Sequence, residues 1–357
     1  MRDLPFFVCN CVEIKKFKKI LVNHYQLVYY INCCKSFAFK EELMIKNFRK
    51  LLVLLALVLV FVTACSKQDS KTQDTKQEDT NKTSGKKTVY ATFFPVADLT
   101  KMIVQDKMDV KTIIKTNEEP HSFELTTDNM KDILKGDLVV YNGAGMESFV
   151  DDLKKSMNDD GKFLDLSKGL TLLDSSSEGS DMKAINPHTW LSVKNAEKML
   201  NTIYEKVSSI DPENENFYKK NLEDSTAKFD LLDKKFEQEL SKVKSKEKYF
   251  VVSHAAFNYL ADDYGLKQVA VTGISPEDEP TAKQLKTIAD FVKDKHISTI
   301  FFEGKATPKV AETLAKNTNT KTSTLYTMEN LDENQVAKGY LKLMEENLKS
   351  LVEAFNE

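Results

Sequence analysis

The sequence has little of several features that mark specialised classes of protein. Of its 357 residues only 11 are glycine and 8 are proline, which excludes collagen-like and Gly/Pro-rich disordered chains. Neither sign of charge dominates, because the chain has 51 Lys and Arg and 54 Asp and Glu. The excess of basic residues that is typical of a nucleic-acid-binding protein is therefore missing. Only one long apolar run occurs, which excludes a protein with several membrane spans. The composition is that of a globular protein with room for about two domains.

Cysteine is missing from everything after Cys65, although the chain has five. Disulfides therefore cannot cross-link the long second part, and no thiolate can bind a metal or attack a substrate there. Charge divides at the same place, because residues 1–64 carry a net charge of +6 and residues 65–357 a net charge of -9. The front of the chain is thus distinct from the rest in composition.

The apolar run lies between a basic segment and a cluster of small residues. Residues 44–50 form a basic segment that contains Lys46, Arg49 and Lys50. Residues 51–62 are all apolar, and Thr63, Ala64 and Cys65 follow. Twelve residues form a helix of about 18 Å, too short for a hydrocarbon core of about 30 Å. The order predicts a lipoprotein signal peptide at 44–64, and its last residues resemble a bacterial lipobox. Lipid on Cys65 would hold the protein at the outer face of the bacterial cell membrane without spanning it.

Two segments flank this signal. We expect residues 1–43 not to be translated and translation to start at Met44, because signal peptides begin at or near the first residue. Residues 40–42 (Lys-Glu-Glu) must be encoded by purine-only codons. These codons lie just upstream of Met44, which is where a bacterial ribosome-binding site would lie. Residues 66–87 contain no apolar residue and cannot bury a core. This composition predicts that residues 65–87 consist of the lipidated Cys65 followed by a disordered tether.

From residue 88 onward, strand and helix patterns alternate, which predicts parallel sheets built from βαβ units. In the first half we expect strands at 89–94, 110–115, 137–142 and 162–165, with helices at 96–105, 126–134 and 146–157. In the second half we expect strands at 249–253, 267–272, 298–302 and 321–326, with helices at 254–264, 281–293, 308–316 and 333–355. Between the halves lie two long helical patterns, at 193–207 and 214–244. The fold class is therefore α/β, with two lobes flanking a helical connector.

Histidine is rare after Cys65, and three of the four histidines there lie where the chain leaves ordered structure. His121 follows a predicted strand, His188 precedes a predicted helix, and His254 follows the strand at 249–253 directly. Glu303 occupies the equivalent place after the strand at 298–302. Three imidazoles and a carboxylate form a four-coordinate set suited to Zn²⁺. The alternative for each histidine is a solvated or structural side chain, which is how we interpret His296 in its charged turn.

Four stretches of sequence resemble the zinc/manganese substrate-binding lipoproteins of ABC transporters, the cluster A-I solute-binding proteins. The stretches are PHSFELTTDNMKDILKGDLVVYNGAGMESFVDDL, NPHTWLS, VVSHAAFNYLADDYGL and STIFFEGKATPKVAETLA. The resemblance implies an N-terminal lobe at 88–212, one long linking helix at 213–245 and a C-terminal lobe at 246–357. It also implies a metal ion in the cleft between the lobes, with His121 and His188 from the first lobe and His254 and Glu303 from the second.

The resemblance further implies a receptor that captures a metal ion outside the cell and delivers it to an ABC permease and ATPase on separate chains. A third histidine, here His254, favours Zn²⁺, whereas manganese members resemble a two-His, two-carboxylate site. Mn²⁺ or Fe²⁺ uptake is the nearest alternative, and a surface adhesin is another. Asp278 or Glu279 could replace Glu303 as a ligand. We expect a monomer that is not an enzyme; a zinc hydrolase is a remote alternative, and no HExxH motif is present.

Overall fold

The computed structural model describes residues 85–175, 184–303 and 308–357, without the side chains of 308–311. The predictions for residues 1–43, for the signal peptide, for Cys65 and for nearly all of the tether lie outside the described residues. The described residues all belong to one compact unit, Lys82–Glu357. Among the helices of the described ranges, none is long and apolar enough to cross a membrane.

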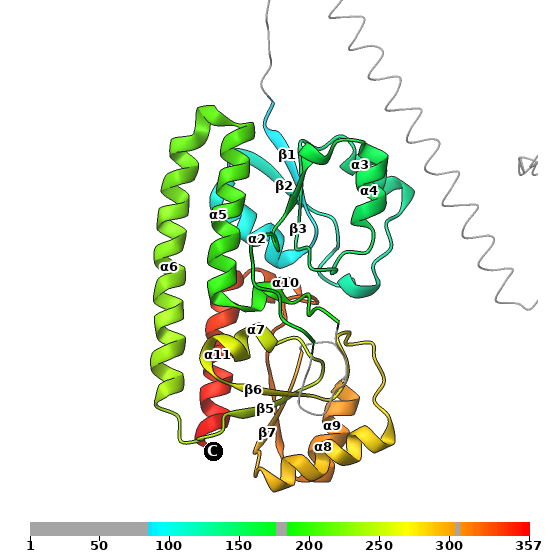
Figure 1. Ribbon diagram of the computed structural model, residues 1–357, viewed down its shortest axis with the longest axis vertical. Helices are drawn as coiled ribbons and strands as arrows, with labels where there is room; N and C mark the ends of the chain where they lie inside the picture. The colour runs from blue at the N-terminus through cyan, green and yellow to red at the C-terminus, as the bar shows by residue number, and fades with distance from the viewer. Residues whose placement is uncertain (1–84, 176–183, 304–307) are drawn as a thin grey trace, which may run out of the picture. The chain divides into compact units, whose positions relative to one another are not determined.

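The first lobe contains a sheet of four parallel strands in the order β2-β1-β3-β4. Its strands are β1 (Lys87–Ala91), β2 (Met108–Thr112), β3 (Leu138–Tyr141) and β4 (Phe163–Asp165). Strand β3 reads LVVY and buries all four side chains, as a strand covered on both faces should. Its helices are α2 (Phe94–Val104) on one side of the sheet and α3 (Thr127–Ile133) and α4 (Val150–Met157) on the other (Figure 1).

The second lobe repeats this topology with a parallel sheet in the order β6-β5-β7-β8. Its strands are β5 (Tyr249–Val252), β6 (Lys267–Ala270), β7 (Thr299–Phe302) and β8 (Lys321–Thr324). Its helices are α7 (Asn258–Tyr264), α8 (Ala282–Asp294), α9 (Pro308–Thr318), α10 (Glu333–Val336) and α11 (Tyr340–Asn356). Helices α8 and α9 lie on one side of this sheet and α7 and α11 on the other (Figure 1).

Two long antiparallel helices follow the first sheet, α5 (Val193–Ile210) and α6 (Glu215–Ser241), joined through a 3₁₀ turn at Pro212–Asn214. Helix α6 contacts both lobes in turn. The side chain of Asn221 donates to the carbonyl of Ile103 on α2 at 2.8 Å, and the ring of Phe236 stacks on Tyr264 of α7 with centroids 4.8 Å apart. Two α/β lobes bridged by one long helix are the predicted fold class, which the structure confirms.

One apolar core runs from the first sheet through α2, α5, α6 and α11 into the second lobe. A smaller core lies between the second sheet and α8 and α9. Helix α11 also joins the lobes, because the backbone N–H of Tyr340 donates to the carboxylate of Asp98 on α2 at 2.8 Å. The ring of Tyr340 stacks on Phe229 of α6, with ring centroids 5.5 Å apart.

Several element boundaries differ from the prediction, and two of the differences affect the functional site. The helix predicted at 254–264 begins only at Asn258, which leaves His254 in irregular backbone beside the sheet. The strand predicted at 321–326 ends at Thr324, although the backbone N–H of Leu325 still donates to the carbonyl of Phe302 at 3.2 Å. The single helix predicted at 333–355 is two helices, because Gly339 has a left-handed φ of 76° between them.

Candidate metal centre

His121 lies in the connection between β2 and α3, on a short 3₁₀ helix at Pro120–Ser122. The proline at its first position presets the helical φ, and the carboxylate of Glu119 accepts a hydrogen bond from the backbone N–H of His121 at 3.2 Å. The His121 side chain keeps 12% of its surface exposed, whereas those of the other residues in the candidate centre are almost fully buried. His121 is therefore the ligand candidate nearest to solvent.

His188 is fully buried just before the 3₁₀ helix at Thr189–Leu191, and the side chain of Asn186 fixes its orientation. The amide oxygen of Asn186 accepts hydrogen bonds from the backbone N–H of His188 at 3.0 Å and from its Nδ1 at 2.7 Å. The amide nitrogen of Asn186 donates to the carbonyl of Ala255 at 2.6 Å. This last bond identifies the amide oxygen and leaves Nε2 of His188 as the free ring nitrogen.

His254 follows β5 at the carboxyl edge of the second sheet and is also fully buried. Its Nδ1 donates to the Oε2 atom of Glu303 at 2.6 Å, while the hydroxyl of Ser253 donates to the Oε1 atom of the same carboxylate at 2.6 Å. Glu303 thus lies behind the ring and directs Nε2 away from itself, as a carboxylate behind a metal-binding histidine does.

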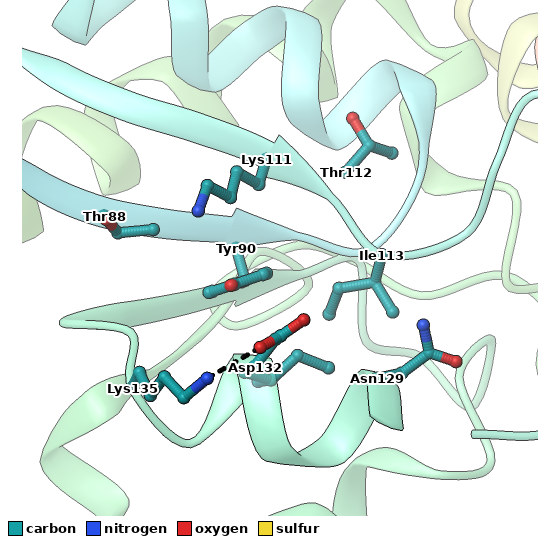
Figure 2. Close-up of a pocket in the computed structure, with 9 residues that line it drawn as sticks. Thr88, Tyr90, Lys111, Thr112, Ile113, Asn129, Asp132 and Lys135 are labelled. Atoms are coloured by element: carbon teal, nitrogen blue, oxygen red, sulfur yellow. Dashed lines mark hydrogen bonds and ion pairs between the residues drawn. The ribbon is translucent and has the colours of Figure 1, made fainter. Parts of the chain in front are cut away.

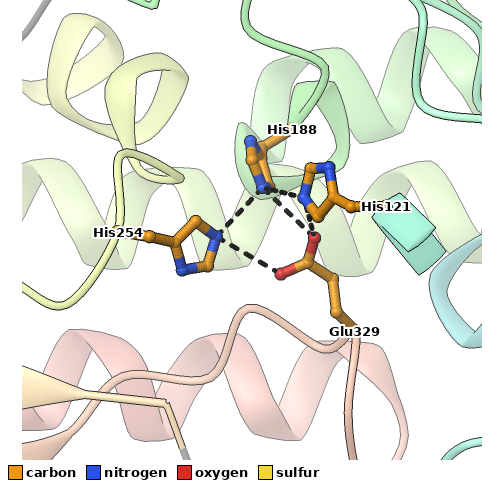
Figure 3. Close-up of side chains that lie close together, drawn as sticks. All are labelled: His121, His188, His254 and Glu329. Atoms are coloured by element: carbon orange, nitrogen blue, oxygen red, sulfur yellow. Dashed lines mark hydrogen bonds and ion pairs between the residues drawn. The ribbon is translucent and has the colours of Figure 1, made fainter. Parts of the chain in front are cut away.

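The carboxylate that meets the three histidines belongs to Glu329, five residues beyond the end of β8. Its oxygens lie 3.0 Å from Nε2 of His121, 3.2 Å from Nε2 of His188 and 3.5 Å from Nε2 of His254. The Nε2 atom of His188 lies 3.2 Å from that of His121 and 3.1 Å from that of His254. Figure 3 shows the three rings and the carboxylate pointing toward one another from four separate segments.

These distances suit a single tetrahedral ion. Four ligands at about 2.0–2.1 Å from a zinc ion lie roughly 3.3 Å apart, close to the spacings in this cluster. Both carboxylate oxygens of Glu329 are buried, and none of the described residues gives them a hydrogen bond that meets the usual geometric criteria. Because Asn186 and Glu303 engage the Nδ1 atoms of two rings, the Nε2 atoms of those rings present lone pairs when neutral. Three imidazoles and a carboxylate in this arrangement can bind a cation at their centre.

Burial and charge shift the pKa values of these groups in opposite directions. Burial lowers the pKa of His188 to about 4 in spite of the nearby Glu329 carboxylate, so this ring is neutral at pH 7. Burial also opposes charge on His254, but the carboxylates of Glu303 and Glu329 outweigh it and raise the pKa to about 10. The three histidines hold the pKa of Glu329 well below its usual range despite its burial.

The structure brings together three of the four residues predicted as ligands. Glu303 is not among the four convergent groups, because both of its oxygens face Ser253 and Nδ1 of His254. Asp278 and Glu279 are exposed in their loop and do not join the group either. The sequence prediction missed Glu329, since the strand predicted at 321–326 placed this residue in a short gap before a helix. Its place beyond the carboxyl end of a strand is a sequence signal, but one that it shares with Glu303.

A separate hollow lies on the first lobe, over β1 and β2 and beside α3, with a volume of about 400 Å³. Figure 2 shows its side chains, among which Tyr90 lies at the floor. Its most prominent charged groups, Asp132 and Lys135, pair with each other at 2.8 Å and are both largely exposed. None of the four convergent residues lines this hollow, so it is not part of the candidate centre.

Residues 89–354 match the family model described as "Zinc-uptake complex component A periplasmic". The high-affinity zinc uptake system protein ZnuA of Bacillus subtilis (strain 168) is 36% identical over 320 residues, covering 86% of this chain and 98% of that protein. The Zn(II)-bound ZnuA-like domain of Streptococcus pneumoniae AdcA is 35% identical with a TM-score of 0.66, covering 76% of this chain and 100% of that domain.

A third relative has an additional activity. The laminin-binding protein Lmb of Streptococcus agalactiae, described as bifunctional with adhesin and metal-transporting activity, is 33% identical with a TM-score of 0.68. The alignment covers 75% of this chain and 99% of that one. The family model matches most of this chain, and a relative that is covered over 98% of its length is 36% identical to it. This chain therefore belongs to the family of zinc-uptake complex component A.

Proposed function

We propose that this protein is an extracytoplasmic receptor that captures Zn²⁺ and delivers it to an ABC permease for uptake. The observation that carries the proposal is the convergence of His121, His188, His254 and Glu329, whose ligand atoms all lie within 4.8 Å of one another. The donor set is the one that Zn²⁺ prefers, since imidazole nitrogen predominates and a single carboxylate supplies charge. The ion is cargo in this function, so it must be bound tightly and then released.

Glu303 has a supporting role in this proposal and is not a ligand. Its oxygens are engaged by Ser253 and His254, so it can orient the His254 ring and increase its basicity without touching the ion. In the same way, Asn186 can orient the ring of His188 by accepting a hydrogen bond from its Nδ1 atom, without touching the ion. Each of the two most deeply buried ring ligands thus has an oxygen acceptor behind it.

The remaining features of the proposal concern where the protein works. The family belongs to zinc-uptake complexes, and the permease and the ATPase are separate chains in this proposal. We propose a monomer anchored by lipid on Cys65 to the outer face of the membrane, with residues 65–87 as a tether. The support is the order of basic, apolar and small residues in the sequence before Cys65. The division into lobes at 88–212 and 246–357, with a linking helix at 213–245, stays part of the same proposal.

A metal-content measurement tests the function. The purified protein, stripped of metal, is offered equal Zn²⁺ and Mn²⁺, and bound metal per chain is measured beside the variants His254→Ala and His296→Ala. We expect one zinc per chain in the wild type and in His296→Ala, and a large loss in His254→Ala. Absence of stoichiometric zinc from the wild-type protein at neutral pH would contradict the proposed function.

A second function, surface adhesion, is supported by the likeness to Lmb, which is described as having adhesin activity. The test compares attachment of cells that lack this protein with attachment of cells that carry Glu329→Gln. Attachment that is lost in the deletion strain and kept in the variant would separate adhesion from zinc capture. Unchanged attachment in the deletion strain would exclude the adhesin function.

A further inference from the structure

The segment that carries Glu329 is held through its backbone. Beyond β8 the backbone has no regular structure and then bends at Met328 and Glu329, and we call residues 326–329 the Glu329 turn. Outside this turn, the backbone N–H of Leu331 donates at 2.8 Å to the carbonyl of Thr116, in the connection that also carries His121. Contacts from two other elements hold the turn itself.

Asn347 on α11 binds both backbone polar groups of Tyr326, and so two consecutive peptide units of the turn. Its amide oxygen accepts from the backbone N–H of Tyr326 at 2.7 Å, and its amide nitrogen donates to the carbonyl of Tyr326 at 2.9 Å. The side chain is fully buried, so no water competes for these bonds. Such a pair fixes both the position and the orientation of the backbone three residues before Glu329.

Trp190 holds the next residue. Its indole N–H donates to the carbonyl of Thr327 at 2.7 Å, and its own carbonyl accepts from the hydroxyl of Tyr340 at 2.5 Å. The indole ring lies against the ring of His188, with centroids 5.2 Å apart, and edge-on to Phe93. One hydrogen bond therefore connects the segment that carries His188 with the segment that carries Glu329.

The backbone between these contacts and Glu329 is strained. Met328 has a φ of 67°, in the left-handed region, although it is a bulky residue with only 1% of its surface exposed. A bulky residue keeps a conformation of this kind only where the surroundings impose it. The strain lies at the residue directly before Glu329, whose carboxylate oxygens face three imidazoles and no other polar side chain of the described residues within hydrogen-bond distance.

We propose that Asn347 and Trp190 are positioning residues that set the zinc affinity of the receptor by holding the Glu329 turn, and with it the Glu329 carboxylate, in the metal centre. The inference rests on the proposed zinc-receptor function and deepens it. Neither side chain touches the ion. Each acts through Glu329, because a shift of about 1 Å in the turn would remove the carboxylate from the range of zinc bonds, at about 2.0–2.2 Å.

The test measures zinc affinity by chelator competition for the wild type, Asn347→Ala and Trp190→Phe, the latter keeping an aromatic ring without the N–H. We expect both variants to lose at least about 10-fold in affinity, as when outer-shell partners of a metal ligand are removed. Asn221→Ala is the matched control, because Asn221 is also a buried asparagine on a helix and donates to a backbone carbonyl on α2. It should lower the thermal midpoint and leave the zinc affinity within about threefold of wild type.

A double-mutant cycle separates positioning from general support of the fold. In a Glu329→Gln background, where the three histidines still bind zinc weakly, Asn347→Ala and Trp190→Phe should change the affinity by less than about threefold. An equal loss in both backgrounds would overturn the proposal, as would affinities that match the Asn221→Ala control. If Asn347→Ala does not fold, Trp190→Phe carries the same cycle. Failure of the wild type to bind zinc would instead refute the proposed function.

Discussion

Glu303 accepts a hydrogen bond from Nδ1 of His254 at 2.6 Å, on the side of the ring opposite to the metal centre. The second oxygen of the same carboxylate is engaged by Ser253, so neither oxygen is free to bind an ion. Glu329 approaches the Nε2 side of the same ring at 3.5 Å. The two glutamates thus face one imidazole from its two nitrogens, and only one of them faces the convergent ligand atoms.

This arrangement predicts different consequences for two isosteric substitutions. Glu303→Gln should lower zinc affinity by about 10- to 100-fold while the protein still binds one zinc per chain, because His254 loses a charged acceptor but stays in place. Glu329→Gln should cost more, since it removes an anionic ligand. Chelator competition with metal analysis measures both. Glu279→Gln, in an exposed loop, is the control and should have no effect. If Glu303→Gln abolished binding and Glu329→Gln did not, the two roles would be exchanged.

Metal preference should depend on His254. Replacing it by aspartate, together with Glu303→Gln to avoid two adjacent buried carboxylates, converts the set to two histidines and two carboxylates. Carboxylate-rich sites suit Mn²⁺ better than imidazole-rich sites do. We expect the ratio of zinc to manganese affinity to fall by about 10-fold, or about 1.4 kcal/mol. Parallel titrations with the two metals measure it, beside Glu303→Gln alone. An unchanged ratio would mean that His254 does not determine selectivity.

Zinc should stabilise the folded protein, because the four ligands come together only in the folded chain. At free zinc 100 times the dissociation constant, the free energy of unfolding should rise by about 2.7 kcal/mol. Thermal unfolding with and without a chelator measures this as an increase of several degrees. In His254→Ala the difference should nearly vanish, whereas in His296→Ala it should persist. An equal zinc effect in all three proteins would place the binding elsewhere.

Glu147 should make the stability of the metal-free protein depend on pH. Burial raises the pKa of this carboxyl to about 7, although Thr92 and the backbone N–H groups of Asn142 and Gly143 donate to it. The folded state keeps the proton on Glu147 to higher pH than the unfolded state does. The resulting contribution of Glu147 to the free energy of unfolding is therefore fully present below about pH 4.5. It is lost as the pH rises through about 7.

The expected contribution of Glu147 to the free energy of unfolding is on the order of 3 kcal/mol, since one pKa unit corresponds to about 1.4 kcal/mol. Urea unfolding of the wild type and of Glu147→Gln between pH 4.5 and 8 measures it. The stability of the wild type relative to the variant should decrease with rising pH. Glu353→Gln, which removes an exposed carboxylate, serves as the control for the loss of one acidic residue. A relative stability that increased with pH would show that Glu147 is ionised throughout.

The three histidines of the centre could be predicted because histidine is rare after Cys65 and each of the three lies at the end of an element. The carboxylate could not be selected in this way among 54 acidic residues. Glu303 follows its strand directly, as a ligand would, but the side chain at that place turns toward Ser253. Glu329 lies in a turn that requires a left-handed Met328, and no sequence pattern predicts that conformation for methionine.

The order of strands and helices could be predicted because buried parallel strands such as β3 and β5 are short, continuous apolar runs. Their exact ends could not, because capping and tertiary contacts decide them. Helix α2 starts at Phe94, inside the predicted strand, since Pro95 favours the first turn of a helix. The helix predicted to begin at His254 starts four residues later, because the segment after β5 serves the metal centre.

The identical strand order of the two sheets makes positions after corresponding strands equivalent. The residue directly after β3 is Asn142, and the residue directly after β7 is Glu303. Asn142 donates to the carbonyl of Pro187 at 2.8 Å and accepts from the hydroxyl of Thr189 at 2.6 Å, and so holds His188 between them. Glu303 holds the ring of His254. The same place in each lobe therefore supports one imidazole of the centre.

The correspondence extends to the central strands. Thr92 after β1 and Ser253 after β5 each donate a hydroxyl hydrogen bond to a buried glutamate. The next residue is His254 in the second lobe but Phe93 in the first, where the ring packs edge-on against Trp190 with centroids 4.8 Å apart. One architecture thus serves two purposes. With an imidazole at this position the lobe supplies a ligand, and with a phenyl ring it supplies the apolar wall beside the tryptophan.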